Sequence, residues 1–197
     1  MDLVVATRNA GKLLEIQDIL EESGIKCRSL ADFPELPPIA ETGASFVENA
    51  LIKARAVAQR ISCPTLADDS GLEVETLGGR PGVRSARFAG EQASDADNNA
   101  RLLLELDGVP PQQRQARFVC ALALVVPGGA TLIVTGDCAG QILEQGRGRG
   151  GFGYDPLFWL PELDKTFAEL TPQEKSQRSH RGQALAKLKQ ELPGFLK

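Results

Sequence analysis

Residues 118–143 read FVCALALVVPGGATLIVTGDCAGQIL, and this stretch decides the fold class of the chain. Its first part, Phe118 to Val126, is a near-continuous apolar run, as expected of a strand buried in a sheet. Pro127 to Gly129 marks a turn, and Thr131 to Leu143 returns as a second long strand. The stretch therefore predicts a β-hairpin, one of the few segments that does not follow a strand–helix–strand pattern.

Strand and helix patterns alternate in the segments outside the hairpin. Short apolar runs predict strands at Leu3–Ala6, Ile25–Leu30 and Pro64–Ala67, and the ADDSG stretch from Ala67 to Gly71 is predicted to be a polar turn after the third. Helical spacing and capping residues predict helices at Lys12–Glu22, from Ser45 to about Ile61, from Ser94 through Leu106, from Thr171, and from about Gly182 to Leu192.

This alternation, together with the hairpin, predicts an α/β fold with a mixed, long central β-sheet flanked by helices. A chain of 197 residues fits one domain, residues 1–197, or one domain that a cleft divides into two lobes. The polar motifs are predicted to follow strands, and in open α/β sheets ligands bind at the carboxyl ends of strands.

Composition limits the classes of function. The chain has 22 Lys and Arg against 26 Asp and Glu, a net charge of −4, and no basic run, which does not favour binding of polymeric nucleic acid. A single histidine excludes a multi-histidine metal site, and the cysteines form no CxxC pair, which favours reduced, mostly buried thiols. Without a membrane-length apolar stretch or a signal-peptide pattern, we expect a cytoplasmic enzyme that does not associate with membranes.

The first motif with chemical potential is TRNAGK, Thr7 to Lys12. It joins a predicted strand to a predicted helix, so that backbone N–H groups at the helix N-terminus can face an anion. Lys12 adds a full charge and Thr7 a hydroxyl. The spacing is not that of a Walker A loop. From spacing alone, a phosphate site and a plain capped turn are equally good interpretations.

A set of acids forms the second motif: Glu41, Asp68 and Asp69. Two adjacent aspartates repel each other, and a hard cation such as Mg²⁺ relieves that repulsion by taking one or two carboxylates as ligands. The alternative is a solvated turn in which one aspartate caps Ser70 or Gly71.

The third motif is GRGRGGFGYDP, Gly146 to Pro156. Its glycines allow a ligand to approach the backbone closely, and Phe152 and Tyr154 offer rings on which a base can stack. No helix pattern follows the GxGxxG match, which argues against a dinucleotide site. The alternative is a mobile hairpin exit with its aromatic rings in the core.

The fourth motif is EKSQRSHRG, Glu174 to Gly182, which gathers Lys175, Arg178, His180 and Arg181. A basic helix face is usually just solvated, and that is the more common interpretation of such a stretch alone. A histidine between Ser179 and Arg181, without apolar neighbours, is harder to place in a core.

In this order, the four motifs resemble the inosine triphosphate pyrophosphatases, also called non-canonical purine NTP pyrophosphatases. The resemblance covers nearly the whole chain, and Arg8 lies at a position that is expected to vary. The matching pieces are VVATRNAGK, ETGASFVENALIKA, LADDSGLEV, GGRPGVRSARFAG, RQARFVCAL, GGFGYDPLF and AELTPQEKSQRSHRGQAL.

The resemblance implies a role for each matching residue. Asp69 is implied to accept the proton of the attacking water with Asp68 in close support, and Glu41 and Asp69 to hold Mg²⁺. His180 and Arg181 are implied to meet the base, and Thr7, Asn9 and Lys12 the triphosphate. The full implied substrate-binding set is Thr7, Arg8, Asn9, Ala10, Gly11, Lys12, Lys53, Ser70, Phe152, Gly153, Tyr154, Asp155, Lys175, His180 and Arg181.

The resemblance also implies a two-lobed α/β protein with its active site in the cleft, usually a homodimer. The implied activity is hydrolysis of dITP, ITP and XTP to the monophosphate and pyrophosphate, which cleanses the nucleotide pool. Two alternatives stay open: a house-cleaning pyrophosphatase for modified pyrimidine triphosphates, and a non-catalytic nucleotide-binding sensor. The complete set of acids argues against the sensor, because binding alone does not need them all.

Overall fold

The computed structural model describes residues 2–21 and 24–195. The helices are α1 (Ala10–Glu21), α2 (Phe46–Ile61), α3 (Asp95–Glu105), α4 (Pro172–Arg178) and α5 (His180–Phe195). The strands are β1 (Asp2–Val5), β2 (Lys26–Ser29), β3 (Thr65–Val74), β4 (Gln115–Val125), β5 (Thr131–Ile142), β6 (Phe158–Leu160) and β7 (Lys165–Thr166). No helix in the described ranges is long and apolar enough to cross a membrane.

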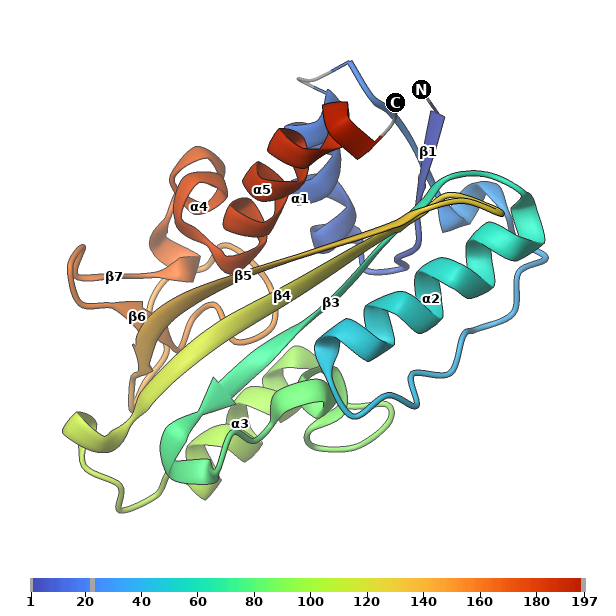
Figure 1. Cartoon of the computed structure of the whole chain (residues 1–197). Coiled ribbons are helices and arrows are strands. Elements are labelled where there is room, and N and C mark those ends of the chain that lie inside the picture. The colour runs from blue at the N-terminus through green and yellow to red at the C-terminus, as the bar shows by residue number, and fades with distance from the viewer. Residues whose placement is uncertain (1, 22–23, 196–197) are drawn as a thin grey trace. The chain divides into compact units, whose positions relative to one another are not determined.

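Within the described residues, the strands form one seven-stranded sheet in the order β2-β1-β3-β4-β5-β6-β7. Strand β1 is parallel to both of its neighbours, as expected where helices connect the strands, and Val4 lies opposite Arg28 on one side and Thr65 on the other. Strand β6 is antiparallel to β5 and β7. The sheet is therefore mixed and flanked by helices, which confirms the fold class predicted from the sequence (Figure 1).

The predicted hairpin is present. Strands β4 and β5 are neighbours in the sheet, and the turn between them is closed by the Val126 N–H, which donates to the Ala130 carbonyl at 3.1 Å. Strand β4 begins at Gln115, earlier than the apolar run, because its first residues alternate between exposed and buried positions. This alternation is the mark of a strand with one solvated face.

The predicted polar turn at ADDSG is wrong, because Ala67 to Gly71 lies inside β3, which continues to Val74. Both aspartates are almost fully buried. A run of polar residues indicates a turn only if the side chains are solvated. Here the two aspartate side chains are paired with cations from other segments and not with water. The two aspartates therefore lie within the strand and not in a turn after it.

Helix α1 begins at Ala10, two residues before the predicted start, because Asn9 acts as an N-cap: its Oδ1 accepts from the Lys12 N–H at 3.0 Å. The predicted end of this helix, Glu22, lies outside the described residues. Helix α5 begins at His180, before the predicted Gly182. The capping predictions at Ser94 and Thr171 are confirmed as reciprocal capping boxes.

Contacts within the chain divide it into two compact units. The first contains the chain up to Asp69, residues 120–136 and the chain from His180 onward; the second contains residues 70–119 and 137–179. Strands β3, β4 and β5 contribute residues to both units, and the boundary between Asp69 and Ser70 falls inside β3.

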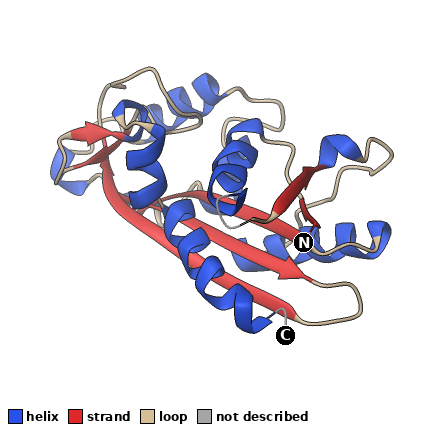
Figure 2. Cartoon of the chain, turned by 90° about the horizontal axis from the view of Figure 1, so that it is seen from above, coloured by secondary structure: helices blue, strands red, loops and turns tan. Residues whose placement is uncertain are grey.

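Apolar residues of β1, β4, α1 and α5 form the core of the first unit. In Figures 1 and 2, α1 and α5 lie on one face of the strands, and in Figure 1 α2 covers the opposite face. Helix α2 buries its small side chains Ala50, Ala54 and Ala58 completely. The core on the α1 and α5 face includes Leu3, Val5, Ile16, Leu20, Leu122, Leu124, Leu185 and Leu188.

A second core of leucine and aromatic residues holds the second unit together. Phe118, Phe158 and Phe167 form an aromatic cluster with ring centroids 4.6–5.6 Å apart. Leu102 and Leu106, from α3 and the residue after it, pack into the same cluster as these rings. The glycine-rich segment from Gly146 to Gly153 follows β5 and has no helix or strand.

Gly136 of β5 allows α5 to pack directly on the strand. A Cβ placed on Gly136 would lie 2.3 Å from the carbonyl oxygen of His180 and 2.6 Å from the Ala184 nitrogen. These are backbone atoms, so the first turn of α5 cannot accommodate a side chain without moving.

We expect Gly136→Ala to lower the free energy of unfolding by about 1–3 kcal/mol or more, the usual cost of overpacking. Gly194→Ala is the matched control, because Gly194 lies near the end of α5, the helix that packs on Gly136, and its added Cβ would meet no atom within 4 Å outside the helix's own nearby backbone. Urea unfolding of both variants measures the effect. Equal stability of Gly136→Ala and wild type would mean that the close approach is absent in solution.

Candidate active site

The turn from Thr7 to Lys12 leads from β1 into α1 and is built by its own side chains. The Asn9 N–H donates to Thr7 Oγ1 at 3.2 Å, and Asn9 Oδ1 caps the helix. The Arg8 guanidinium donates to the Leu36 carbonyl at 2.8 Å, which ties the turn to the loop after β2. Ala10 and Gly11 are the first residues of α1. The turn is thus a preformed helix N-terminus, a geometry suited to an anion.

The Asp68 carboxylate is the centre of a buried ion cluster in the first unit. Its side chain is 0% exposed, and it forms ion pairs with Lys12 through Oδ1 and with Arg181 through Oδ2, the latter at 2.9 Å. The Cys120 thiol lies 3.2 Å from Oδ2. Burial alone raises the pKa of Asp68, but the charges of Arg181 and Lys12 outweigh it and hold the pKa well below its usual value. Asp68 therefore stays ionised and acts as an anchor for two cations.

Arg181 is shared between two carboxylates. Its Nε donates to Asp68 and its NH1 pairs with Glu15 of α1. Burial lowers the pKa of Arg181, while the charges of Asp68 and Glu15 raise it more, so that the net shift is upward. The sequence left open that Arg181 lies on a solvated helix face. This interpretation is wrong for Arg181, which is almost fully buried.

Lys53 of α2 holds the second acidic group. Its Nζ donates to Glu41 Oε1 at 3.0 Å, to Asp69 Oδ1 at 3.2 Å and to the Asp68 backbone carbonyl at 2.6 Å. Burial lowers the pKa of Lys53, but the charges of Asp69 and Glu41 raise it, and the net shift is upward. Lys53 therefore remains a cation and pairs with Glu41 and Asp69, the two acids that the resemblance implied as metal ligands.

Asp68 and Asp69 differ because successive side chains of a strand point to opposite faces. Asp68 pairs with α1 and α5, whereas Asp69 pairs with α2, the helix on the opposite face in Figure 1. Asp69 Oδ2 is buried and has no hydrogen-bond partner among the described residues. Burial raises the pKa of Asp69, and the charges of Lys53 and Lys12 reverse this only in part. Asp69 thus has an acceptor oxygen to offer a ligand.

The residues present fit a magnesium ion. Mg²⁺ commonly takes one or two protein carboxylates together with water and substrate phosphates. Glu41 and Asp69 supply two carboxylates joined through one lysine, and the buried Asp69 Oδ2 has no hydrogen-bond partner among the residues that the structure describes. No cluster of three or more acidic, histidine or cysteine ligands occurs in the part of the chain that the structure describes, so a closed all-protein cage is not formed there.

In the second unit, a buried ion pair joins Lys175 and Asp155 at 2.6 Å. The Lys175 ammonium also lies 4.6 Å from the centroid of the Phe152 ring, a cation–π geometry. Asp155 accepts from the Phe152 N–H at 2.9 Å. Lys175, Asp155 and Phe152 therefore form one group of contacting residues in the second unit.

The aromatic residues of the third motif have different environments. Tyr154 is 4% exposed and donates its hydroxyl to the Ser85 carbonyl at 2.8 Å, so that it belongs to the core. Burial raises its pKa above the usual range. Phe152 is only partly buried. Of the two rings, Phe152 is the one that can present a face to a ligand.

His180 is the first residue of a segment of the first unit, and Ser70 is the first residue of a segment of the second unit. His180 is the first residue of α5 and is 3% exposed, and Ser70 follows Asp69 in β3. The sequence did not single out Glu15, Cys120, Asp95 and Asn99, which contact candidate residues. Glu15 follows Lys12 by three residues on one helix, a spacing that brings two side chains to the same face. The contacts themselves are all long-range, with partners 52 to 166 positions apart in the sequence.

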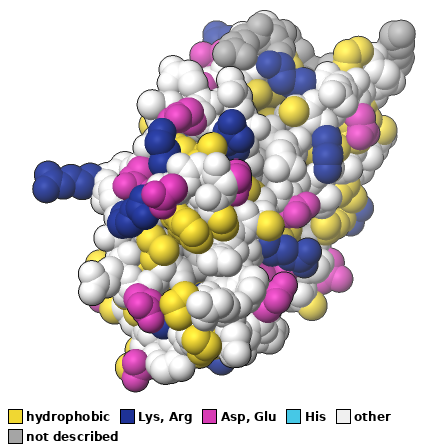
Figure 3. Space-filling model, turned by 90° about the vertical axis from the view of Figure 1, so that its left-hand side faces the viewer, with side chains coloured by type: hydrophobic (Ala, Val, Ile, Leu, Met, Phe, Trp, Pro, Cys, Tyr) yellow, Lys and Arg dark blue, Asp and Glu magenta, His cyan; other side chains and the backbone are white. Residues whose placement is uncertain are grey.

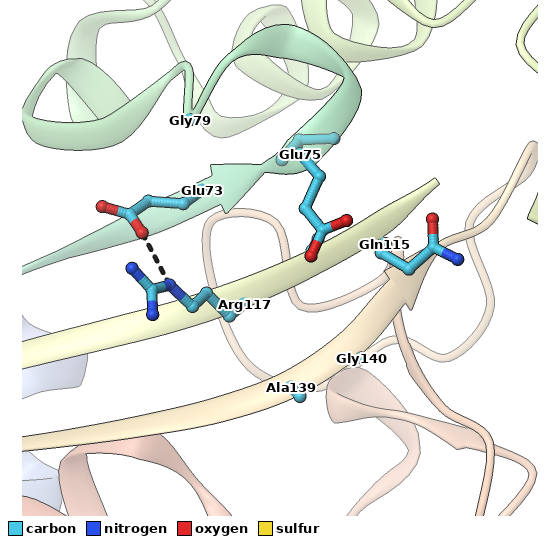
Figure 4. Close-up of a pocket in the computed structure, with 9 residues that line it drawn as sticks. Glu73, Glu75, Gly79, Gln115, Arg117, Ala139 and Gly140 are labelled. Carbon is cyan, nitrogen blue, oxygen red and sulfur yellow. Dashed lines mark hydrogen bonds and ion pairs between the residues drawn. The ribbon is translucent and has the colours of Figure 1, made fainter. Parts of the chain in front are cut away.

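A pocket of about 420 Å³ lies outside this residue set, on the solvated face of β3, β4 and β5 in the second unit. Figure 4 shows Glu73 and Arg117 paired across it at 2.7 Å, and the Glu75 carboxylate on the side of Gln115. None of its lining residues belongs to the four sequence motifs.

The Ham1 family model matches residues 3–191. The dITP/XTP pyrophosphatase of Geobacillus kaustophilus is 57% identical over 187 residues, which are 95% of this chain and 92% of that protein. The dITP/XTP pyrophosphatase of Exiguobacterium sibiricum is 53% identical over 100% of this chain and 99% of its own length.

Among solved structures, a HAM1 protein from Coxiella burnetii superposes with a TM-score of 0.89 at 44% identity, covering 98% of this chain and 99% of that chain. The dITP/XTP pyrophosphatase of Mycobacterium abscessus gives a TM-score of 0.77 at 48% identity, covering 95% and 97%. The full-length matches and the shared fold agree with the resemblance that the motifs indicated. The chain belongs to the Ham1 family.

Proposed function

We propose that this protein hydrolyses non-canonical purine nucleoside triphosphates, including dITP, ITP and XTP, to the monophosphate and pyrophosphate. The observation that carries the proposal is the arrangement around β3: Lys12 and Lys53 are held by a pair of adjacent aspartates, and one buried oxygen of Asp69 has no hydrogen-bond partner within residues 2–21 and 24–195. Relatives at 53–57% identity bear the name dITP/XTP pyrophosphatase.

The triphosphate would be held by the first unit. A nucleoside triphosphate carries about four negative charges, and more charge develops on the leaving pyrophosphate, so fixed cations contribute most of the stabilisation. Lys12 and Lys53 are oriented by carboxylates before substrate arrives, and the α1 N-terminus adds backbone N–H groups from the Thr7–Lys12 turn.

Asp69 is the proposed proton acceptor for the attacking water. Its Oδ1 is bonded to Lys53, while Oδ2 is left to accept from a water molecule. Asp68 has both oxygens engaged by protein donors and supports the reaction by orienting Lys12. Glu41 and Asp69 would hold Mg²⁺, and a bound Mg²⁺ would supply positive charge to neutralise the phosphates.

Selection of the base follows from hydrogen-bond polarity. Hypoxanthine and xanthine carry a 6-oxo acceptor where adenine carries a 6-amino donor, so a site with donors at this position rejects adenine. In the first unit, His180 and Arg181 are the first two residues of α5, and Arg181 is held by Asp68 and Glu15. In the second unit, Phe152 offers a ring beside Lys175 for stacking.

The wider setting is part of the same proposal. We place the protein in the cytoplasm as a homodimer whose protomer is one domain with two lobes, acting on free nucleotides and not on polymeric nucleic acid or membranes. The face in Figure 3 supports the exclusion of nucleic acid, because basic and acidic side chains are interspersed over it. A polymer of phosphates would favour a continuous basic surface.

Incubation of the pure protein and Mg²⁺ with a panel of triphosphates tests the function. We expect pyrophosphate and monophosphate to appear in step, with kcat/KM for ITP, dITP and XTP above that for ATP by up to about 10⁴-fold and GTP intermediate or poor. Release of orthophosphate with diphosphate, or equal use of ATP and ITP, would contradict the proposal. Binding without turnover would indicate a sensor, and preference for modified pyrimidines the related pyrophosphatase.

A matched pair of variants separates the two aspartates. Asp69→Asn removes the proton acceptor, so we expect turnover to fall by about 10²-fold or more at saturating Mg²⁺ with little loss of stability. Asp68→Asn leaves Lys12 and Arg181 without their buried counter-charge and should lower the free energy of unfolding by about 3–5 kcal/mol. Turnover and urea unfolding are measured for both, and near-normal turnover of Asp69→Asn would refute its role.

Lysine variants test the grip on the phosphates. Lys12→Ala and Lys53→Ala each remove a charged hydrogen bond, which should weaken triphosphate binding by about 1.5–3 kcal/mol while binding of the nucleoside changes little. Lys26→Ala, at an exposed position of β2, is the control for a general loss of charge. Calorimetric titration gives the affinities, and unchanged triphosphate binding in both variants would place the phosphates elsewhere.

A further inference from the structure

Gly153 is held by two side chains of one helix. Its N–H donates to Asp95 Oδ2 at 2.6 Å, and its carbonyl accepts from Asn99 Nδ2 at 2.9 Å. Asp95 and Asn99 are four residues apart near the start of α3 and therefore lie on the same face of the helix. Both polar backbone groups of Gly153 thus bind to α3, and all these residues belong to the second unit.

The backbone at Gly153 requires this support. Its φ of +60° lies in the left-handed region, where glycine is favoured. A turn of this kind has other accessible conformations, because glycine adopts many backbone angles at similar energy. Two hydrogen bonds from a helix select one of these conformations.

The residues on either side of Gly153 each have one anchoring contact with another partner. The Phe152 N–H is bound by Asp155, which Lys175 holds in an ion pair, and the Tyr154 hydroxyl is bound by the Ser85 carbonyl. The orientation of the peptide between the Phe152 ring and buried Tyr154 is therefore set by α3. Release of this peptide would let the partly buried Phe152 turn, while Tyr154 would stay in the core.

We propose that Asp95 and Asn99 are positioning residues that hold Gly153 so that Phe152 presents its ring to the base of the substrate. The inference rests on the proposed function, because it takes Phe152 as the stacking partner of a nucleobase. It adds the first two turns of α3, which no sequence motif singled out, to the parts of the chain that determine nucleotide binding.

The proposal makes the effect dependent on the base. Inorganic triphosphate has no base and would be held by Lys12 and Lys53 of the first unit. Its affinity should not depend on Asp95 or Asn99. Affinity for ITP should depend on both residues, and the two losses should not add, since each variant releases the same peptide.

The experiment compares Asp95→Ala, Asn99→Ala and the double variant with wild type. We expect KM for ITP to rise about 3- to 10-fold in each single variant, with kcat within about twofold and the inhibition constant of inorganic triphosphate unchanged. The KM of the double variant for ITP should be at most about twice the KM of the single variant with the larger KM. Asp95→Asn, which keeps an acceptor for the Gly153 N–H, should recover most of the lost affinity.

Asp97→Ala is the matched control on the same helix. Asp97 completes the capping box, and its carboxylate accepts from Ser94 and not from Gly153. It should lower the melting temperature without changing KM. A variant that only lowers the melting temperature therefore does not reproduce the expected rise in KM.

Three outcomes decide the proposal. Unchanged KM for ITP in Asp95→Ala and Asn99→Ala would overturn it, as would an equal loss of affinity for inorganic triphosphate. If Asp97→Ala raised KM as much as the other variants, the effect would come from helix stability, which also overturns it. Failure of the proposed function is distinguishable, because wild type itself would then not release pyrophosphate from ITP.

Discussion

The buried negative charge of Asp68 constrains the first unit more than any other group. An ionised carboxylate without solvent is tolerated only when paired, and breaking such a pair is strongly destabilising. Lys12 and Arg181 meet this requirement, and they come from helices at opposite ends of the chain. The requirement to neutralise one carboxylate therefore holds the start of α1, the middle of β3 and the start of α5 together. These segments carry the proposed phosphate-binding and base-binding residues.

Each unit uses a buried ion pair to fix a segment that would face substrate. Asp68 orients Lys12 and Arg181 in the first unit, and Asp155 holds Lys175 beneath the Phe152 ring in the second. The alternation of side chains along β3 then gives the adjacent acids different environments. Both oxygens of Asp68 bind protein groups, while Asp69 on the opposite face keeps an oxygen for a ligand. Rigid charges placed before binding cost little reorganisation during the reaction, which suits phosphate chemistry.

Much of the fold is local and was predictable for that reason. The hairpin follows from two apolar runs around Pro127–Gly129, and the helix starts at Ser94 and Thr171 follow from capping residues three positions apart. The failure at ADDSG has a clear cause. The polarity of Asp68 and Asp69 is cancelled by cations that are distant in the sequence, so no local pattern distinguishes a charged strand from a solvated turn.

The sequence alone determined the fold class and the family resemblance, and it supplied the candidate site residues, because these depend on residue type, order and short-range periodicity. It could not divide the roles of Asp68 and Asp69, separate Phe152 from Tyr154, or find Glu15, Asp95 and Asn99. Those distinctions depend on which face of β3 a side chain occupies, on burial, and on contacts between residues up to 166 positions apart. Tertiary packing decided them, since the energy of a charge or a hydrogen bond depends on the partners and the solvent that the fold places around it.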